Sequence, residues 1–353
     1  MNQIMIVNEK TMKEILDIGN VIEVVKEAYQ LKASQQADLF PIITHVFEPG
    51  IADMDIKSGH IKGKQNVFGL KLVSWFSHNK QIGLPEVTGT VMLFDGKTGA
   101  PKGILAAEYM TGMRTGAAGA IGSEYLARKD SRTLLLIGAG HQAYFQLAAH
   151  LLVLENIDQV MVYDPIKPES AIHFCKEIKE KLIENILSAY QSNKQVYQKM
   201  LKKFNRVEFL PVKDIAGSAN KADIIVTATP SNKPLIHSEW IAKGTHITCI
   251  GADMEGKQEI DENIFTQAKV FVDDIYQAIH YGEAEMPYKK GLLKKEDIMA
   301  EIGEVILGKK SGRTSKEEIT IFDSTGIALQ DLMTAALALE KAKEKNIGMI
   351  GEV

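Results

Sequence analysis

The chain has 353 residues, of which 45% are hydrophobic and 24% charged, and this is typical of a globular protein whose core is divided between two domains. The formal net charge of −4 excludes a basic surface for nucleic acid or anionic membranes. Two distant cysteines, Cys175 and Cys249, exclude a disulfide framework, and the charged N-terminal segment without a long apolar run predicts a cytoplasmic protein with no membrane span.

The first forty residues predict helix, and the next stretch predicts antiparallel strands. In the first stretch apolar side chains recur at intervals of three and four residues, namely Ile15, Ile18, Ile22, Val25 and Tyr29. From 41 to 105, short β-rich runs are separated by glycines. The sequence "DGKTG" at 95–99 has the composition of a hairpin turn, so we expect the runs on either side of it to pair.

A glycine-rich helix is predicted from 109 to 129. Its glycines are spaced four, three and three residues apart and so share one helical face; they are Gly112, Gly116, Gly119 and Gly122. A face without side chains lets another backbone or a cofactor approach closely, and we predict close packing there. A flexible loop is the alternative, which the interleaved alanines disfavour.

From 131 onward, strand and helix patterns alternate. The runs "TLLLI", "QVMVYD", "DIIVTAT", "THITCIG" and "AKVFVD" are apolar along most of their length, as in strands buried on both faces of a parallel sheet. We therefore predict an α/β fold in which a Rossmann doubly wound parallel sheet domain, 129–320, is inserted in a discontinuous α+β domain formed by 1–128 and 321–353. The long connection 166–205 predicts an extended helix or a helical pair.

The turn after "TLLLI" predicts a dinucleotide site. Gly138, Gly140 and Ala143 form a G-x-G-x-x-A pattern between a strand and a helix, which His141 and Gln142 open. The first glycine permits the tight turn, the second lets the backbone approach a pyrophosphate, and the small third residue lets the helix pack on the strand. A tight strand–helix turn without a ligand is the alternative interpretation.

An acidic residue at the end of the next strand indicates which dinucleotide binds. "QVMVYD" ends in Asp164, about 24 residues after the glycines, where a carboxylate accepts hydrogen bonds from the adenosine ribose hydroxyls. No arginine or lysine follows immediately to pair with a 2′-phosphate. We therefore predict NAD in preference to NADP as the cofactor. No histidine or cysteine spacing is typical of a metal site, so we predict no metal.

Further motifs run in order through residues 60–335. They include "GLPEVTGTVMLFDGKTGAPKG", "MTGMRTGAAGAIG", "GTHITCIGADMEGKQEID" and "TIFDSTGIALQD". In these motifs the chain resembles the ornithine cyclodeaminase/μ-crystallin family. The resemblance implies a homodimer, in which the domain outside the nucleotide fold forms both the interface and the floor of the substrate site. It also implies a small amino-acid or imino-acid substrate.

Three residues match family positions that act on the substrate. By resemblance, Lys71 in "GLKLVS" and Arg114 in "GMRTGAAG" bind the substrate carboxylate, and Lys71 belongs to the catalytic residues together with Asp253, which manages protons at the amine. Without the family they would be read as a snorkelling surface lysine, a surface helix arginine and a turn-forming aspartate. Three further residues at strand ends are predicted to line the cofactor: Thr227, Thr229 and Ser324.

Two activities remain open, and the resemblance favours the first. In an ornithine cyclodeaminase, the α-carbon gives a hydride to NAD, the terminal amine attacks the imine, ammonia leaves, and the hydride returns to give proline. In an alanine-type or opine-type dehydrogenase, or a cyclic ketimine or imine reductase, the hydride is not returned. A non-enzymatic crystallin-like binding protein is a third possibility, which the joint presence of the three substrate residues disfavours.

One departure from the family bears on ornithine. Cyclodeaminases usually carry an arginine in the first β-run as a further carboxylate ligand, whereas "FPIITHVFEPG" at 40–50 contains none. The task would then fall to Lys71 and Arg114 alone. A terminal ammonium would need an acid as well, for which Glu86 and Asp55 are candidates.

Overall fold

The computed structural model describes residues 3–190 and 193–352, and the chain divides into two compact units. Unit 1 comprises 1–114 and 327–353, and unit 2 comprises 115–326. The divisions fall at 114/115 and 326/327, whereas the sequence placed them at 128/129 and 320/321. Unit 2 is one continuous segment that lies in the sequence between the two segments of unit 1.

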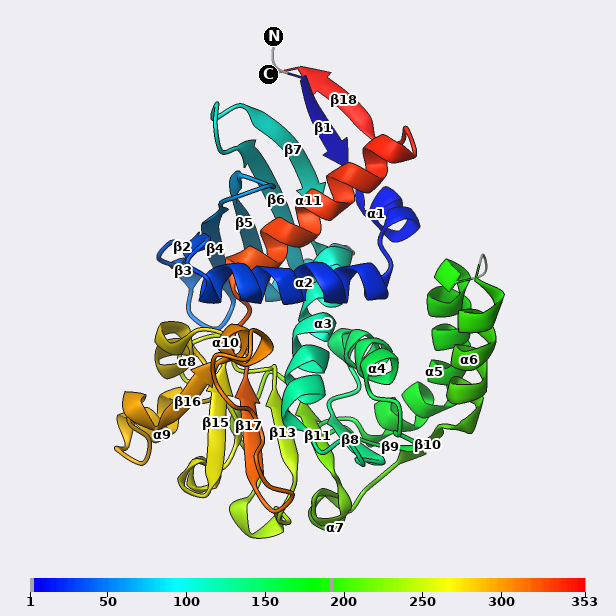
Figure 1. The fold of residues 1–353 in the computed structure, drawn as a ribbon, viewed down its shortest axis with the longest axis vertical. Coiled ribbons are helices and arrows are strands. Elements are labelled where there is room, and N and C mark those ends of the chain that lie inside the picture. The colour runs from blue at the N-terminus through cyan, green and yellow to red at the C-terminus, as the bar shows by residue number, and fades with distance from the viewer. Residues whose placement is uncertain (1–2, 191–192, 353) are drawn as a thin grey trace. The chain divides into compact units, whose positions relative to one another are not determined.

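Unit 1 is built on a mixed eight-stranded sheet (Figure 1). Its strands follow the order β18-β1-β7-β6-β5-β4-β2, with β3 paired to β4. Four consecutive strands, β4 to β7, pair antiparallel, and "DGKTG" joins the last two as predicted. The strands are β1 (Gln3–Val7), β2 (Ala37–Leu39), β3 (Ile43–Glu48), β4 (Ala52–Ile61), β5 (Val67–Phe76), β6 (Val87–Asp95), β7 (Pro101–Ala106) and β18 (Met349–Glu352).

Helices cover one face of this sheet. The helices of unit 1 are α1 (Glu9–Ile15), α2 (Ile18–Ala33), η1 (Ser77–Ile82) and α11 (Ala328–Glu344). Figure 1 shows α11 crossing the sheet with α2 beside it. Two glycines let α11 approach closely: a Cβ built on Gly59 would lie 3.1 Å from Leu329, and one on Gly69 would lie 3.0 Å from Leu332. The side chains of β4 and β5 on this face therefore lie under the first turns of α11.

Unit 2 is built on a second eight-stranded sheet, in which every strand pair is parallel. The strand order is β10-β9-β8-β11-β13-β17-β15-β16. These strands are β8 (Thr133–Ile137), β9 (Gln159–Tyr163), β10 (Glu208–Pro211), β11 (Ile224–Thr227), β13 (His246–Cys249), β15 (Ala268–Val272), β16 (Ile298–Glu301) and β17 (Ile319–Asp323); β12 (Asn232–Ile236) and β14 (Gln258–Ile260) pair separately. The chain runs from β8 toward one edge and from β11 toward the other, so the predicted doubly wound sheet is confirmed.

Short and long helices connect these strands. They are α4 (His141–Val153), α5 (Pro168–Leu187), η2 (Ser188–Tyr190), α6 (Lys194–Arg206), α7 (Ile215–Lys221), η3 (Ser238–Trp240), η4 (Glu262–Thr266), α8 (Ile275–Tyr281), α9 (Glu285–Lys289), η5 (Lys295–Asp297) and α10 (Ile302–Ile306). Helices α5 and α6 form the long connection after β9, so the connection is the helical pair and not the single extended helix. Within 3–190 and 193–352, no helix combines the length and apolarity that a membrane crossing requires.

The domain boundaries differ from the predicted ones for two physical reasons. Helix α3 (Glu108–Leu126) carries the predicted glycine face, and its second half packs within unit 2: a Cβ on Gly116 would lie 2.3 Å from the Phe145 carbonyl oxygen, and one on Gly122 would lie 2.1 Å from the Phe322 ring. Strand β17 lies between β13 and β15, so it belongs to the parallel sheet. The close packing predicted for the glycines is confirmed at both positions.

Candidate active site

The glycine turn after β8 has the shape that a dinucleotide requires. Gly138 adopts a φ of +101°, and a Cβ there would lie 2.7 Å from the Ala228 carbonyl oxygen, so only glycine fits. A Cβ on Gly140 would meet nothing within 4 Å, which leaves space beside the first turn of α4 for a phosphate. Ala143 is buried, and His141 is exposed at the start of the helix. The residues present therefore fit the pyrophosphate of NAD.

Asp164 lies beside this turn, at the end of β9. Its Oδ2 accepts the N–H of Ala139 at 3.2 Å, and its Oδ1 accepts the N–H groups of Ile166 and Lys167 at 3.0 and 2.8 Å. These bonds hold the carboxylate next to the glycine turn. Strands β8 and β11 are also where the sheet order reverses, and α/β folds of this type bind ligands outside the carboxyl ends of such strands.

Asp164 should determine the choice of coenzyme. We expect the protein to bind NAD at least about tenfold more tightly than NADP, because a carboxylate repels a 2′-phosphate. Asp164→Ser should narrow that difference, with the serine hydroxyl still able to bond the ribose. Fluorescence titration with both coenzymes measures the effect, and equal affinities of the unaltered protein would contradict this assignment.

The strand ends of unit 2 also gather buried carboxyls. Thr229 donates through both its N–H and its hydroxyl to Glu259 at 2.7 Å, and Thr227 donates to the same carboxylate at 2.6 Å. The Ser324 hydroxyl donates to Asp273 at 3.0 Å. The three hydroxyls that we predicted to line the cofactor are thus bonded within the unit, and their role toward a cofactor stays a prediction.

Asp323 is a further buried carboxyl at the end of β17. Its Oδ2 accepts the N–H of Ala284 at 2.9 Å, while its Oδ1 is buried and has no hydrogen-bond partner among the described residues. Burial, reinforced by the nearby Asp273 carboxylate, raises the pKa of Asp323 to about 8. The group is therefore largely protonated in the folded protein at neutral pH.

Asp323→Asn should become more stable relative to the unaltered protein as the pH rises. A carboxyl whose pKa is raised by folding stabilises the fold while protonated, and this contribution is lost as the pH passes from about 4 through 8. Asparagine imitates the protonated form at every pH. From pH 5 to pH 9 the difference in unfolding free energy should shift toward the variant by more than about 1 kcal/mol. Urea unfolding measures it, with the exposed Glu184→Gln as control; parallel curves would contradict the assignment.

In unit 1, Lys71 and Arg114 meet at one carboxylate, that of Asp331. Lys71, on β5, is 2% exposed, and its Nζ lies 3.0 Å from Asp331 Oδ1. Arg114 Nε donates to the same oxygen at 3.0 Å. The predicted lysine–arginine pair is therefore buried in one place, and neither residue is the surface side chain of the alternative interpretation.

The guanidinium is held from a second side as well. Arg114 Nη1 donates to Gln330 Oε1 at 3.0 Å, and Gln330 Nε2 donates to the Tyr29 hydroxyl at 2.6 Å. All three side chains are at least nine-tenths buried. Side chains fixed in this way present a preorganised cation, which is the arrangement that binds a carboxylate bidentately.

The charged groups of this cluster shift one another's pKa values. Burial, followed by the Arg114 cation, lowers the pKa of Lys71 to about 7, although the Asp331 carboxylate opposes the shift. Burial alone would raise the pKa of Asp331, but Arg114 and Lys71 outweigh it and hold that pKa below its usual range. Lys71 can therefore exchange a proton near neutral pH, which suits a catalytic group as well as an anchor.

Two residues of this cluster were not predicted from the sequence. Asp331 lies in the first turn of α11 within "ALQDLMTAALAL" and is fully buried. Lys57 lies on β4 directly opposite Lys71 and is 6% exposed. The sequence feature that could have indicated Asp331 is a charged residue within an otherwise apolar helix face. The feature that could have indicated Lys57 is a lysine in register with a candidate site residue on the neighbouring strand.

Asp253 lies in the loop after β13, in unit 2. Its Oδ1 is 2.5 Å from the Nζ of Lys257, and its side chain is 45% exposed. A partly exposed carboxylate can accept a proton from a substrate amine. Its predicted role at the substrate amine is compatible with this environment and stays a prediction.

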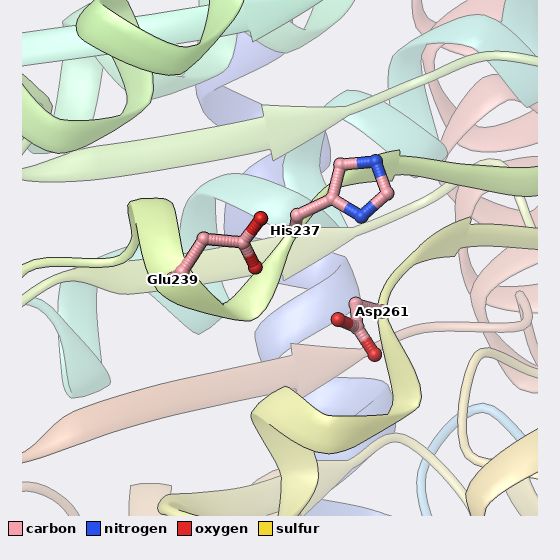
Figure 2. A group of neighbouring side chains, drawn as sticks. All are labelled: His237, Glu239 and Asp261. Atoms are coloured by element: carbon pink, nitrogen blue, oxygen red, sulfur yellow. The ribbon is translucent and has the colours of Figure 1, made fainter.

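A separate group of side chains has the composition of a metal site. His237, Glu239 and Asp261 bring their ligand atoms within 4.8 Å of one another (Figure 2). Asp261 already accepts N–H groups from Asn263 at 2.9 Å and from Ser238 at 3.3 Å, as the cap of η4. Glu239 is exposed, and exposed acidic groups of this kind are common without an ion, so we assign no metal to them.

Comparison with known proteins identifies the family. The model of the ornithine cyclodeaminase/mu-crystallin family matches residues 1–346. The chain belongs to this family. An alanine dehydrogenase from Archaeoglobus fulgidus is 38% identical over 98% of this chain and 97% of its own length. The family resemblance inferred from the sequence motifs is thereby confirmed.

Two solved structures of the family are similar in fold along nearly the whole chain. An archaeal alanine dehydrogenase dimer with bound NAD is 36% identical, with a TM-score of 0.87 and 99% of each chain covered. A Δ1-pyrroline-2-carboxylate reductase from Thermococcus litoralis, in complex with NADH and L-proline, is 30% identical, with a TM-score of 0.86 and 98% and 99% covered. Both relatives carry the cofactor that Asp164 predicts for this chain.

Proposed function

We propose that the protein is an NAD-dependent amino-acid dehydrogenase or imine reductase that transfers a hydride at the α-carbon of a 2-amino or 2-imino acid. The observation that carries the proposal is the buried meeting of Lys71 and Arg114 at Asp331, which prepares a cationic site for an α-carboxylate. The glycine turn and Asp164 supply the NAD site. The dehydrogenase and the reductase named above support the second of the two activities left open by the sequence.

In the proposed reaction the site residues have separate roles. Arg114 and Lys71 hold the substrate carboxylate and so orient the α-carbon, while Asp253 accepts a proton from the amine. NAD, when bound, would supply the hydride acceptor for that carbon. In the oxidative direction, hydrolysis of the imine would give an oxo acid and ammonia; in the reductive direction, an imine would be the substrate.

The fate of the hydride tests the proposal against ornithine cyclodeaminase. Amino acids such as L-alanine should give NADH in proportion to the oxo acid formed. L-Ornithine, supplied in large excess over NAD, should give no proline. If ornithine instead yields proline and ammonia with no lasting rise in NADH absorbance, the cyclodeaminase takes the place of this proposal.

Asp253→Asn tests the proton-transfer role. Asparagine keeps the size of the side chain and most hydrogen bonding but cannot accept a proton, so kcat should fall on the order of 100-fold. The affinity of an unreactive substrate analogue, measured by calorimetry, should change much less. An equal loss of binding and turnover would make Asp253 a binding residue.

We also propose that the protein acts as a homodimer through unit 1. Its strands β3 and β5 expose large apolar side chains, among them Ile43, Phe47, Leu72 and Phe76, each 37% exposed or more. A second copy that covers them would remove this apolar surface from water. Light scattering should give twice the mass of the chain, and a monomer at micromolar concentration would contradict the proposal.

A further inference from the structure

The loop that carries Asp253 is bound by a buried carboxylate from a later segment of unit 2. Glu285, the first residue of α9, is fully buried, and its Oε2 accepts the N–H of Gly256 at 2.8 Å. Gly256 adopts a φ of +81°, which favours glycine, and it lies three residues after Asp253. Glu285 therefore contacts the backbone of the loop close to the residue to which we assigned proton transfer.

A second glutamate of the same segment binds the backbone where the loop ends. The N–H groups of Glu259 and Ile260 both donate to Glu283 Oε1, at 2.8 and 2.7 Å. The carboxylate of Glu259 in turn accepts the N–H of Gly251 at 2.8 Å, at the start of the loop. The loop is thus held at both ends, and Glu285 holds the turn between them.

The segment that carries the two glutamates is itself attached to the parallel sheet. Between them, Ala284 donates its N–H to Asp323 Oδ2, at the end of β17, at 2.9 Å. A Cβ on Gly282 would lie 2.6 Å from the same oxygen, so a larger residue there would clash. Glu283 and Glu285 therefore project from a backbone whose position the sheet determines.

The charge of Glu285 is balanced within its surroundings. Its Oε1 lies 2.5 Å from the Nζ of Lys289, one turn along α9, and Lys289 also pairs with Glu255 of the loop at 2.9 Å. An apolar side chain would fill the same volume without the cost of burying a charge, so the role of Glu285 lies in the groups that it binds. A carboxylate that accepts a backbone N–H forms one of the stronger hydrogen bonds in proteins.

We propose that Glu285 is a positioning residue of the proposed reaction, which determines where Asp253 lies by holding the backbone of its loop. The inference rests on the proposed function, because it connects Glu285 to the proton transfer of that reaction. Lys257 also contacts the Asp253 carboxylate, at 2.5 Å, but it belongs to the same loop. A displacement of about 1 Å can lower a rate about 100-fold, so a fixed position requires a contact from outside the loop, such as that of Glu285.

The kinetics of three variants test the proposal. Glu285→Met fills a similar volume but cannot accept the N–H of Gly256, so kcat should fall about 10- to 100-fold. KM for the amino acid and the affinity for NAD should stay within about threefold, because no group that binds either one is removed. Glu285→Gln keeps an oxygen that accepts the N–H, so its kcat should stay within about threefold of the normal value.

Glu255→Gln is the matched control. Its side chain is 75% exposed and pairs with Lys289, so the change weakens that ion pair but leaves the bond from Gly256 to Glu285 in place. Its kcat should equal that of the unaltered protein. Equal losses of kcat in Glu285→Gln and Glu285→Met would show that the charge of Glu285 matters and not its bond to Gly256, and would overturn the inference.

Hydrogen exchange measures the loop itself. Mass spectrometry of peptides that cover 252–258 should show slow exchange at Gly256 in the unaltered protein and in Glu285→Gln, and at least about tenfold faster exchange in Glu285→Met. Fast exchange at Gly256 in the unaltered protein would overturn the inference, and this measurement does not depend on whether a variant folds. A loss of kcat in Glu285→Met without faster exchange would overturn it as well.

Failure of the proposed function gives a different result. In that case no amino acid yields NADH with the unaltered protein, although exchange at Gly256 still depends on Glu285, and the inference falls with the function. If amino acids do yield NADH, and Asp253→Asn lowers kcat while Glu285→Met does not, only the positioning role of Glu285 is lost.

Discussion

Arg114→Met should lower kcat/KM for the amino-acid substrate about 30- to 1,000-fold, or roughly 2–4 kcal/mol, and leave the fold intact. Methionine fills much of the arginine's volume but cannot bond a carboxylate. Arg114 is 6% exposed and is fixed by Asp331 and Gln330, so its contacts with a substrate would be made away from water, where they are strong.

The charge balance of the cluster explains why stability should survive this change. After the substitution Asp331 still has Lys71 at 3.0 Å, with Lys57 on the neighbouring strand. Lys71 and Asp331 still form an ion pair, so neither of these two buried charges is left without an opposite one. We therefore expect the unfolding free energy to change by less than about 1 kcal/mol.

Two readouts distinguish this result from a general disturbance. NAD binding should be unchanged, because the glycine turn and Asp164 belong to unit 2. The titration of Lys71 should move to higher pH in the pH profile of kcat/KM, since the Arg114 cation contributes to the lowered pKa of that lysine. Arg132→Met, which removes a guanidinium 70% exposed, is the control. Near-normal turnover of Arg114→Met would remove this residue from the site.

The parts of the fold that depend on local pattern could be predicted from the sequence. The buried strands of unit 2, the "DGKTG" hairpin and the glycine turn each occupy a short, continuous segment with its own periodicity or turn chemistry. Strand β17 was predicted as a strand, but the strands with which it pairs could not be predicted. The chain returns with it between β13 and β15 after β16 has formed the edge, and sequence order does not record this return.

The same distinction separates the nucleotide-binding residues from the cluster around Asp331. Gly138 and Asp164 are close along the chain, and one sequence motif covers both. Asp331 is 260 residues from Lys71 and 217 from Arg114, so no spacing rule connects them. Family resemblance supplied the two cations but not the carboxylate that holds them, which only the packing of α11 on β4 and β5 brings into place.

Asp331→Asn should produce the opposite result to Arg114→Met, a severe loss of stability. Asparagine has almost the shape of aspartate and still accepts a hydrogen bond, so the change removes one negative charge and little else. Lys71 and Arg114 then stay buried without the carboxylate that both of them contact. Removal of one partner from a buried ion pair costs about 3–5 kcal/mol, and the unfolding free energy should fall by that amount.

The pH dependence of this loss identifies its cause. The pKa of Lys71 is already lowered to about 7, and without the Asp331 carboxylate it should fall further. Lys71 can then shed its proton as the pH rises, which removes one of the uncompensated charges. The loss measured by urea unfolding should therefore be larger at pH 6 than at pH 9. Asp38→Asn, which breaks a half-exposed pair with Lys62, should cost less than about 1 kcal/mol at either pH.

A double variant tests whether unbalanced positive charge causes the loss of stability. If Asp331→Asn is destabilising because cations are left unbalanced, a second substitution that removes one of them should restore stability. Arg114→Met in the Asp331→Asn background should thus raise the unfolding free energy by about 1–3 kcal/mol, although it has little effect alone. Simple addition of the two single effects would show instead that Asp331 stabilises α11 by its shape or hydrogen bonds. The carboxylate would then be a helix residue and not the counterion of a substrate site.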